Sequence, residues 1–172
     1  LIKLLDRAPT ISQNTVKKIL ERELGANWQN IFSEFNASPI AAASFAQVHK
    51  AVLNSGEEVV VKIQRPEVEK NFRNDIKLLH ILAKMLDWFN IFPILAPGMI
   101  INEFEKWTKV ELDYRLEAEN ALILQKSINN NLLIPKIFTD YTSKYLLIEE
   151  FLPGQSVNKV ISQNQTADFA WA

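Results

Sequence analysis

One lysine lies inside a strongly apolar run, where a cation is uncommon. Lys62 follows three valines in VVVKIQRP, and the β-branched residues before it predict a strand. Burying an unpaired ammonium is costly, so Lys62 requires an anionic partner if its face of the strand points inward. If that face is solvated, Lys62 is an ordinary surface lysine. The residues around it in the sequence must distinguish these two interpretations.

A stretch of small residues precedes Lys62 by one predicted hairpin. In PIAAASFAQVHKA, Ala41, Ala42, Ala43 and Ser44 form what we call the alanine loop. Backbone N–H groups of such a loop, together with the Ser44 hydroxyl, can bind a phosphate. Alanine adopts left-handed backbone geometry only at a cost of about 1–2 kcal/mol, so this loop is stiffer than a glycine loop. Close packing at a strand edge is the alternative explanation for the alanines.

Three carboxylates follow in a predicted helix. The segment ELDYRLEAEN contains Glu111, Asp113 and Glu117, and helical spacing places Asp113 and Glu117 on one face. In nucleotide-binding kinases a strand lysine pairs with the nucleotide phosphates and with a helix glutamate. The alanine loop, Lys62 and this helix are therefore a candidate nucleotide site. A solvated acidic helix face is the other interpretation.

The elements that must position these residues include both helices and strands. Helical periodicity, N-cap and stop signals predict helices over residues 12–24, 28–36, 68–89 and 102–127. Strand composition predicts a hairpin of 46–53 and 57–63 around NSG, and two more strands at 136–140 and 145–151. A further helix is expected to begin after the Pro153-Gly154 turn. This order predicts an α+β fold.

Composition excludes several classes of protein. The chain has 172 residues, 19 Lys and Arg against 20 Asp and Glu, and no Cys, so disulfides and thiolate sites are absent. The scattered basic residues argue against a nucleic-acid partner. No His/Asp/Glu cluster has metal-ligand spacing, and no secretory signal is recognisable. The uncharged segment 88–101 is too short to span a membrane, and we expect a buried connection between two helices there.

Four motifs in a fixed order resemble the UbiB family of atypical protein-kinase-like proteins. They are PIAAASFAQVHKA, VVVKIQRP, ELDYRLEAEN and LLIEEFLPG, and they extend from residue 39 to 154. The helical segment before them is similar to the corresponding stretch of that family. The resemblance implies a helical extension at 1–38 and a kinase-like small lobe at 39–154, an antiparallel sheet with helices and a helical insertion at about 66–101. Residues 155–172 are then the start of a large lobe or a tail.

The resemblance also implies roles for individual residues. The alanine loop covers ATP or ADP, bound with Mg²⁺ in the complete protein, and Lys62 neutralises the phosphates. Glu117 is the expected partner of Lys62, with Glu111 as the alternative. Glu111 and Asp113 match the family's Glu-x-Asp motif, which faces the nucleotide.

The adenine ring is expected at LLIEEFLPG, the last of the four motifs. The resemblance implies that backbone groups of Glu149 and Phe151 bind the ring and that Ile148 closes the back of the pocket.

Two hypotheses about function follow. A kinase-like catalyst needs a catalytic-loop carboxylate and a metal-binding Asp from the large lobe, and we find neither. Asp168-Phe169-Ala170 resembles the metal-binding Asp-Phe-Gly motif of kinases, but it has Ala in place of Gly. It also follows the LLIEEFLPG segment, the expected hinge between the lobes, too closely for a catalytic loop to lie between them. The family's Lys-x-Gly-Gln element is expected upstream of Leu1. The chain is therefore interpreted as the ATP-binding portion of an atypical kinase or ATPase supporting quinone or isoprenoid-lipid biosynthesis, inactive alone and with an exposed apolar surface.

The alternative is a catalytically inactive nucleotide-sensing or lipid- and protein-interaction module. The expected partners are a nucleotide, quinone-biosynthesis proteins, a membrane lipid surface and the large lobe. A cytoplasmic or organellar location, peripheral to a membrane and not secreted, fits these partners.

Overall fold

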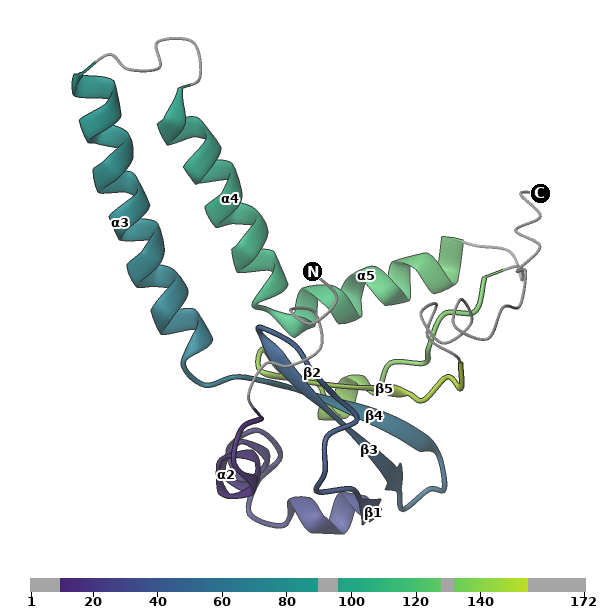
Figure 1. Cartoon of the computed structure of the whole chain (residues 1–172). Helices are drawn as coiled ribbons and strands as arrows, with labels where there is room; N and C mark the ends of the chain where they lie inside the picture. The colour runs from purple at the N-terminus through teal and green to yellow at the C-terminus, as the bar shows by residue number, and fades with distance from the viewer. Residues whose placement is uncertain (1–9, 90–95, 128–131, 155–172) are drawn as a thin grey trace, which may run out of the picture.

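The protein is an antiparallel sheet with helices on both faces and a long helical hairpin projecting from one end (Figure 1). The computed structural model describes residues 10–89, 96–127 and 132–154. The Asp168-Phe169-Ala170 segment and the helix expected after Gly154 lie outside these residues. The predicted α+β class is confirmed.

The sheet is built around a hairpin of two strands. β3 (Ala46–Leu53) and β4 (Glu58–Gln64) pair antiparallel, and β5 (Leu146–Glu150) pairs with the other side of β4. β1 (Phe32–Phe35) and the short β2 (Ala41–Ala42) both pair with β3. The hairpin turn contains Gly56 with φ of 97°, a backbone geometry that favours glycine. The predicted hairpin is confirmed.

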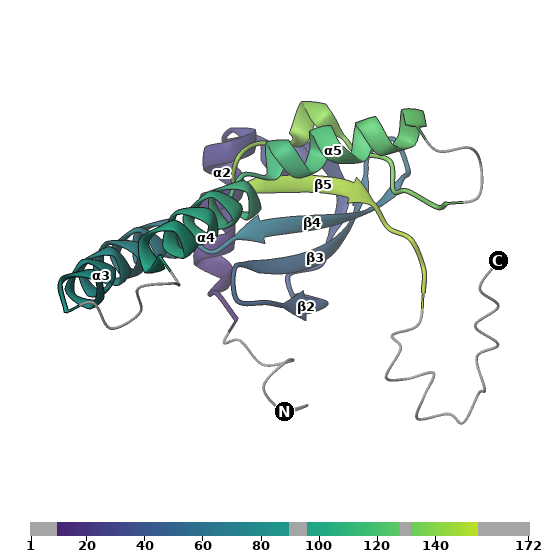
Figure 2. The same ribbon diagram turned by 90° about the horizontal axis from the view of Figure 1, so that it is seen from above.

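Each face of the sheet packs against a different helix (Figure 2). Val61, Ile63 and Ile148 point to the face covered by α2 (Gln13–Leu24) and join its Ile19 and Leu20 in the larger core. On the other face Leu147, Ile137, Tyr114 and Ala118 form a smaller core beneath α5 (Tyr114–Ser127). Side chains alternate along a strand, so the residues between these core positions of β4 point toward α5.

The helices at 12–24 and 68–89 are confirmed as α2 and α3 (Val68–Trp88). The helix expected at 28–36 is wrong in its second half. A 3-10 turn, η1 (Trp28–Ile31), leads directly into β1. Phe32 and Phe35 make edge-to-face contacts with Trp28 from this extended backbone. Pairing with β3 therefore outweighs the helical spacing of the aromatic residues.

The single helix expected at 102–127 is also wrong, because two helices occupy this region. α4 (Pro97–Glu111) ends before Leu112, and α5 begins at Tyr114. The Asp113 carboxylate accepts a hydrogen bond from the Arg115 N–H at 3.2 Å and so caps α5. The helical spacing had predicted that Asp113 and Glu117 share one helix face. This prediction is wrong, because Asp113 precedes α5 and Glu117 lies within it.

The strand expected at 136–140 is reduced to one bridge. Ile137 pairs with Glu149, and the chain then turns through η2 (Thr139–Tyr141). The neighbouring prediction of a strand at 145–151 is confirmed as β5.

α3 and α4 form the projecting hairpin, which we call the helical arm (Figure 1). Large apolar side chains are exposed along it, among them Trp88 at 86% and Met99 at 70%. The connection expected to be buried at 88–101 is therefore exposed at both of its described ends; residues 90–95 lie outside the described part. None of the described helices combines the length and apolar character needed to cross a membrane.

A series of hydrogen bonds through two buried polar side chains fixes the start of the described fold to β3. His49 is fully buried, and its Nδ1 donates to the Asn36 carbonyl at 2.8 Å. Its Nε2 lies 2.9 Å from the Gln47 amide nitrogen, while the Gln47 oxygen accepts from the Ile11 N–H at 2.8 Å. This arrangement requires a neutral imidazole. Burial lowers the pKa of His49 from the ordinary value of 6.5, although the hydrogen bond to Asn36 opposes this change.

We predict that acid weakens the fold through His49. As pH falls below about 6.5 the unfolded chain binds a proton that the folded chain does not, so the free energy of unfolding decreases by up to about 1.4 kcal/mol per pH unit. Urea unfolding at pH 7.5, 6.5 and 5.5 measures this. His49→Gln should flatten the decline, whereas His80→Gln, on the helical arm, should retain it. An equal slope in wild type and His49→Gln would contradict the prediction.

Candidate nucleotide site

Lys62 points from the centre of the sheet toward α5. It lies on β4 opposite Val48 of β3 and Leu147 of β5. Its neighbours Val61 and Ile63 are fully buried on the other face, which fixes the register of the strand. The Lys62 ammonium therefore emerges beside the smaller core and beneath the first turn of α5.

Two carboxylates bind this ammonium. Nζ of Lys62 lies 2.7 Å from Glu117 of α5 and 3.0 Å from Glu149 of β5. The side chains of Lys62 and Glu149 are only 27% and 14% exposed, whereas that of Glu117 is 46% exposed. Burial disfavours the charged amine, but hydrogen bonds and charge attraction from both carboxylates outweigh it and raise the pKa of Lys62.

The structure thus joins Lys62 to Glu117 and not to Glu111. Glu117 lies in the first turn of α5, where the helix dipole favours a carboxylate. Glu111, the last residue of α4, lines a cleft of about 420 Å³ together with Glu117, Asn120 and Leu124. Glu111 is thus near the pair without contacting the ammonium.

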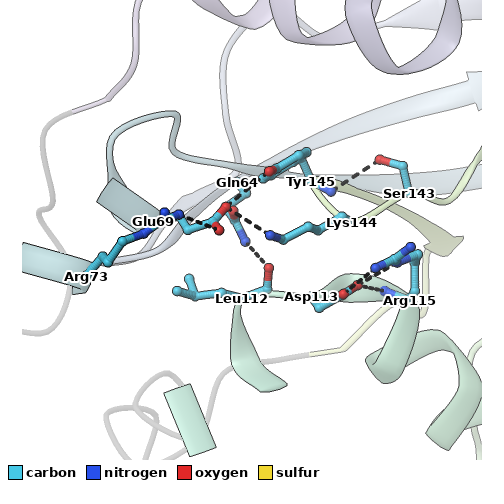
Figure 3. Close-up of polar contacts among 9 residues, drawn as sticks. All are labelled: Gln64, Glu69, Arg73, Leu112, Asp113, Arg115, Ser143, Lys144 and Tyr145. Carbon is cyan, nitrogen blue, oxygen red and sulfur yellow. Dashed lines mark hydrogen bonds and ion pairs between the residues drawn. The ribbon is translucent and has the colours of Figure 1, made fainter. Parts of the chain in front are cut away.

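Asp113 lies on a different surface. Its carboxylate accepts two hydrogen bonds from the Arg115 guanidinium, at 2.9 and 2.6 Å, which hold the pKa of Asp113 below its usual value (Figure 3). Asp113 lines a cavity of about 490 Å³ beside Lys144 and Glu69, at the base of the helical arm. The two carboxylates of the Glu-x-Asp pattern are therefore separated by the break between α4 and α5.

The contact of Glu149 with Lys62 was missed by sequence reasoning, which assigned only its backbone. The signal was available from strand pairing. Leu147 is opposite Lys62, and a residue two positions later on β5 projects from the same face. Glu149 is therefore the diagonal neighbour of Lys62.

The same alternation corrects the expected role of Ile148. Its side chain is fully buried in the larger core, away from the face that carries Lys62. Leu147 is the strand residue on the Lys62 side. The Phe151 N–H donates to the Glu58 carbonyl at 2.9 Å, so within the described fold only its carbonyl remains for a ligand.

The alanine loop begins as a strand and then turns. Ala41 and Ala42 form β2, and the Ala43 N–H donates to the Ala46 carbonyl at 2.8 Å. Ala41, Ala43 and Ser44 are exposed, so close packing does not explain these small residues. Ala96 is the one non-glycine residue with positive φ among those described. The alanines thus present their backbone in an unstrained geometry.

The Lys62 ammonium keeps hydrogen-bonding capacity for a further anion. A lysine ammonium has three N–H donors, so one remains after the contacts to Glu117 and Glu149. Among residues 10–89, 96–127 and 132–154 no group of three His, Cys, Asp or Glu side chains could hold a metal ion. The described residues therefore offer no such ligand set for the Mg²⁺ expected with ATP.

Comparison with known proteins identifies the family of this chain. Residues 3–169 match the family profile described as the ABC1 atypical kinase-like domain. The chain belongs to this family. ABC1 members similar to it include the Arabidopsis thaliana chloroplastic protein ACTIVITY OF BC1 COMPLEX KINASE 7, 36% identical over 93% of this chain and 23% of that protein. A probable protein kinase UbiB from Marinobacter nauticus is 38% identical over 88% of this chain and 28% of its own length.

A solved structure of an ABC1-like fold is also similar. Rv3197 of Mycobacterium tuberculosis, determined in complex with erythromycin, has a TM-score of 0.79 and 32% identity over 96% of this chain and 41% of that one. The ABC1 chain described here spans about a quarter of the two curated relatives. Its antiparallel sheet and helices match a kinase-like small lobe.

We predict that Glu149 contributes more than Glu117 to holding Lys62. Double-mutant cycles combine Lys62→Met with Glu149→Gln or with Glu117→Gln, and urea unfolding gives the coupling free energy. The less exposed Glu149 pair should give about 1–2 kcal/mol. The more solvated Glu117 pair should give less than about 1 kcal/mol. The exposed Lys106 and Glu103 pair on α4 is the control and should give less than about 0.5 kcal/mol. Coupling near zero for both Lys62 pairs would contradict the site.

Proposed function

We propose that this chain is the nucleotide-facing part of an ABC1 atypical kinase or ATPase and that it binds ATP or ADP at Lys62. The observation that supports this most directly is the 2.7 Å contact between Lys62 on β4 and Glu117 on α5. A kinase small lobe uses the same kind of ion pair, between a strand lysine and a helix glutamate, to position the nucleotide phosphates.

The residues of the chain act on the nucleotide by charge and position. Lys62 donates its remaining N–H to a phosphate oxygen, and Glu117 keeps the ammonium oriented. The exposed alanine loop offers backbone N–H groups and the Ser44 hydroxyl to the same phosphates. Phosphate competes with Glu149 for Lys62, because both are anions that bind one ammonium.

Phosphate transfer needs groups that we do not find in this sequence. A catalytic-loop carboxylate and metal-binding groups complete a kinase site. The curated relatives are about four times as long as the matched region, so we assign these groups to the rest of such a protein. We propose that the complete protein, with Mg²⁺, supports quinone or isoprenoid-lipid biosynthesis.

The partners and location belong to the same proposal. Apolar side chains exposed on the helical arm suit a membrane lipid surface or a protein of that pathway. A cytoplasmic or organellar location is proposed, and one similar relative is described as chloroplastic.

A second function is favoured by one observation. Lys62 is already neutralised by two carboxylates rather than one. In an ABC1 chain with this arrangement, a nucleotide phosphate could replace Glu149 as a partner of the Lys62 ammonium. The chain would then sense the nucleotide without transferring its phosphate. Such a protein would be a catalytically inactive nucleotide-sensing module.

Nucleotide-dependent thermal stability tests the proposed binding. ATP or ADP with Mg²⁺ at about 100 times Kd should add about 2.7 kcal/mol to the free energy of unfolding. Lys62→Ala should abolish this gain because it removes the phosphate contact. Lys106→Ala, an exposed lysine on α4, is the matched control and should retain it. If wild type and Lys62→Ala gain equally, Lys62 is not at a phosphate.

A further inference from the structure

Two residues of VVVKIQRP other than Lys62 make long-range contacts from the end of β4. Gln64 is 2% exposed, although its side chain is an amide. Arg65 follows it at once and leaves the sheet. The contacts of Lys62 with Glu117 and Glu149 do not explain why Gln64 is buried or why an arginine follows it.

Gln64 holds the junction between α4 and α5. Its Nε2 donates to the Leu112 carbonyl at 2.9 Å in a buried contact (Figure 3). Leu112 is the last residue before Asp113 caps α5, so this bond satisfies a carbonyl at a helix end. The Tyr114 N–H donates to the Lys144 carbonyl at 3.2 Å and fixes the other side of the junction. Gln64 is therefore one of the groups that hold the start of α5, and with it Glu117, in place.

Arg65 holds the alanine loop from the same strand end. Its Nε donates to the Ala43 carbonyl at 2.9 Å, and its backbone N–H donates to the Phe45 carbonyl at 3.0 Å. Its Nη2 is buried without a hydrogen-bond partner in the described part of the chain. The Arg65 guanidinium is thus bound to the loop through Nε, and its Nη2 group remains, among the described residues, as an unpaired donor beside the loop.

We propose that Gln64 and Arg65 are positioning residues of the nucleotide site. Lys62, Gln64 and Arg65 lie within four residues of one strand end, so the distances from Lys62 to the loop and to α5 are set by short, stiff connections. Arg65 keeps the alanine loop at a fixed distance from Lys62. Gln64 keeps Glu117 within reach of the ammonium. This inference rests on the proposed nucleotide binding, but its structural part can be measured without a nucleotide.

Hydrogen exchange of the 172-residue chain tests the structural part. Arg65→Ala should accelerate exchange in residues 40–46 by about tenfold, the effect of losing one such bond. Exchange within residues 47–53 of β3 and within β4 should change no more than in Arg73→Ala, which removes an exposed arginine of α3. Gln64→Leu should accelerate exchange in the first turn of α5 and leave residues 40–46 unchanged. Uniform acceleration over the whole chain would overturn the positioning roles.

Nucleotide affinity tests the functional part. Binding of ADP with Mg²⁺, measured well below the unfolding temperature, should weaken about tenfold in Arg65→Ala and in Gln64→Leu, and remain unchanged in Arg73→Ala. Arg65→Lys should recover only part of the affinity, because a lysine ammonium cannot reproduce the planar guanidinium donors. Wild-type binding with unchanged affinity in both variants would overturn this inference and leave the proposed function intact. Absence of wild-type binding would instead overturn the proposed function.

Discussion

The arrangement of this protein depends on placing one ammonium inside a sheet. Lys62 lies on a central strand between two cores and loses much of its hydration. That loss is offset only if anions are brought within hydrogen-bonding distance. Glu149 comes from the adjacent strand, but Glu117 is 55 residues away in sequence. The chain must therefore leave the sheet through the helical arm, return, and start a new helix over the same face.

The break between α4 and α5 follows from this requirement. A straight continuation of α4 would follow the axis of that helix past the base of the arm, whereas α5 turns away from this axis and lies over the sheet (Figure 1). Asp113 ends one helix and caps the next, and Gln64 binds the carbonyl left at the break. Tyr114 and Ala118 then pack against Leu147, so apolar contacts hold α5 where the carboxylate is needed. The ion pair and the smaller core thus support each other.

Sequence reasoning predicted the parts of the fold that local pattern determines. Apolar spacing in α2 and α3, and the NSG turn between β-branched strands, each specify one structure within a few residues. The break at Leu112 could not be predicted this way, because the carbonyl there is satisfied by Gln64, 48 residues earlier. The strand at Phe32 likewise depends on pairing with β3. At the site, the Lys62 and Glu117 pair came from a family resemblance, whereas Glu149 required the register of β4 and β5.

The stiffness of the alanine loop has a consequence for how a nucleotide binds. A glycine loop closes on phosphates by changing its backbone, but the alanines here start in a strand and are bonded to β3 and to Arg65. Little backbone entropy remains to be lost in this loop when a ligand arrives. The adjustment must then come from side chains, and the third N–H of the Lys62 ammonium is the donor that neither carboxylate occupies. In the proposed function a phosphate oxygen competes with Glu149 for this ammonium, so charge competition at Lys62, and not loop closure, sets the nucleotide affinity.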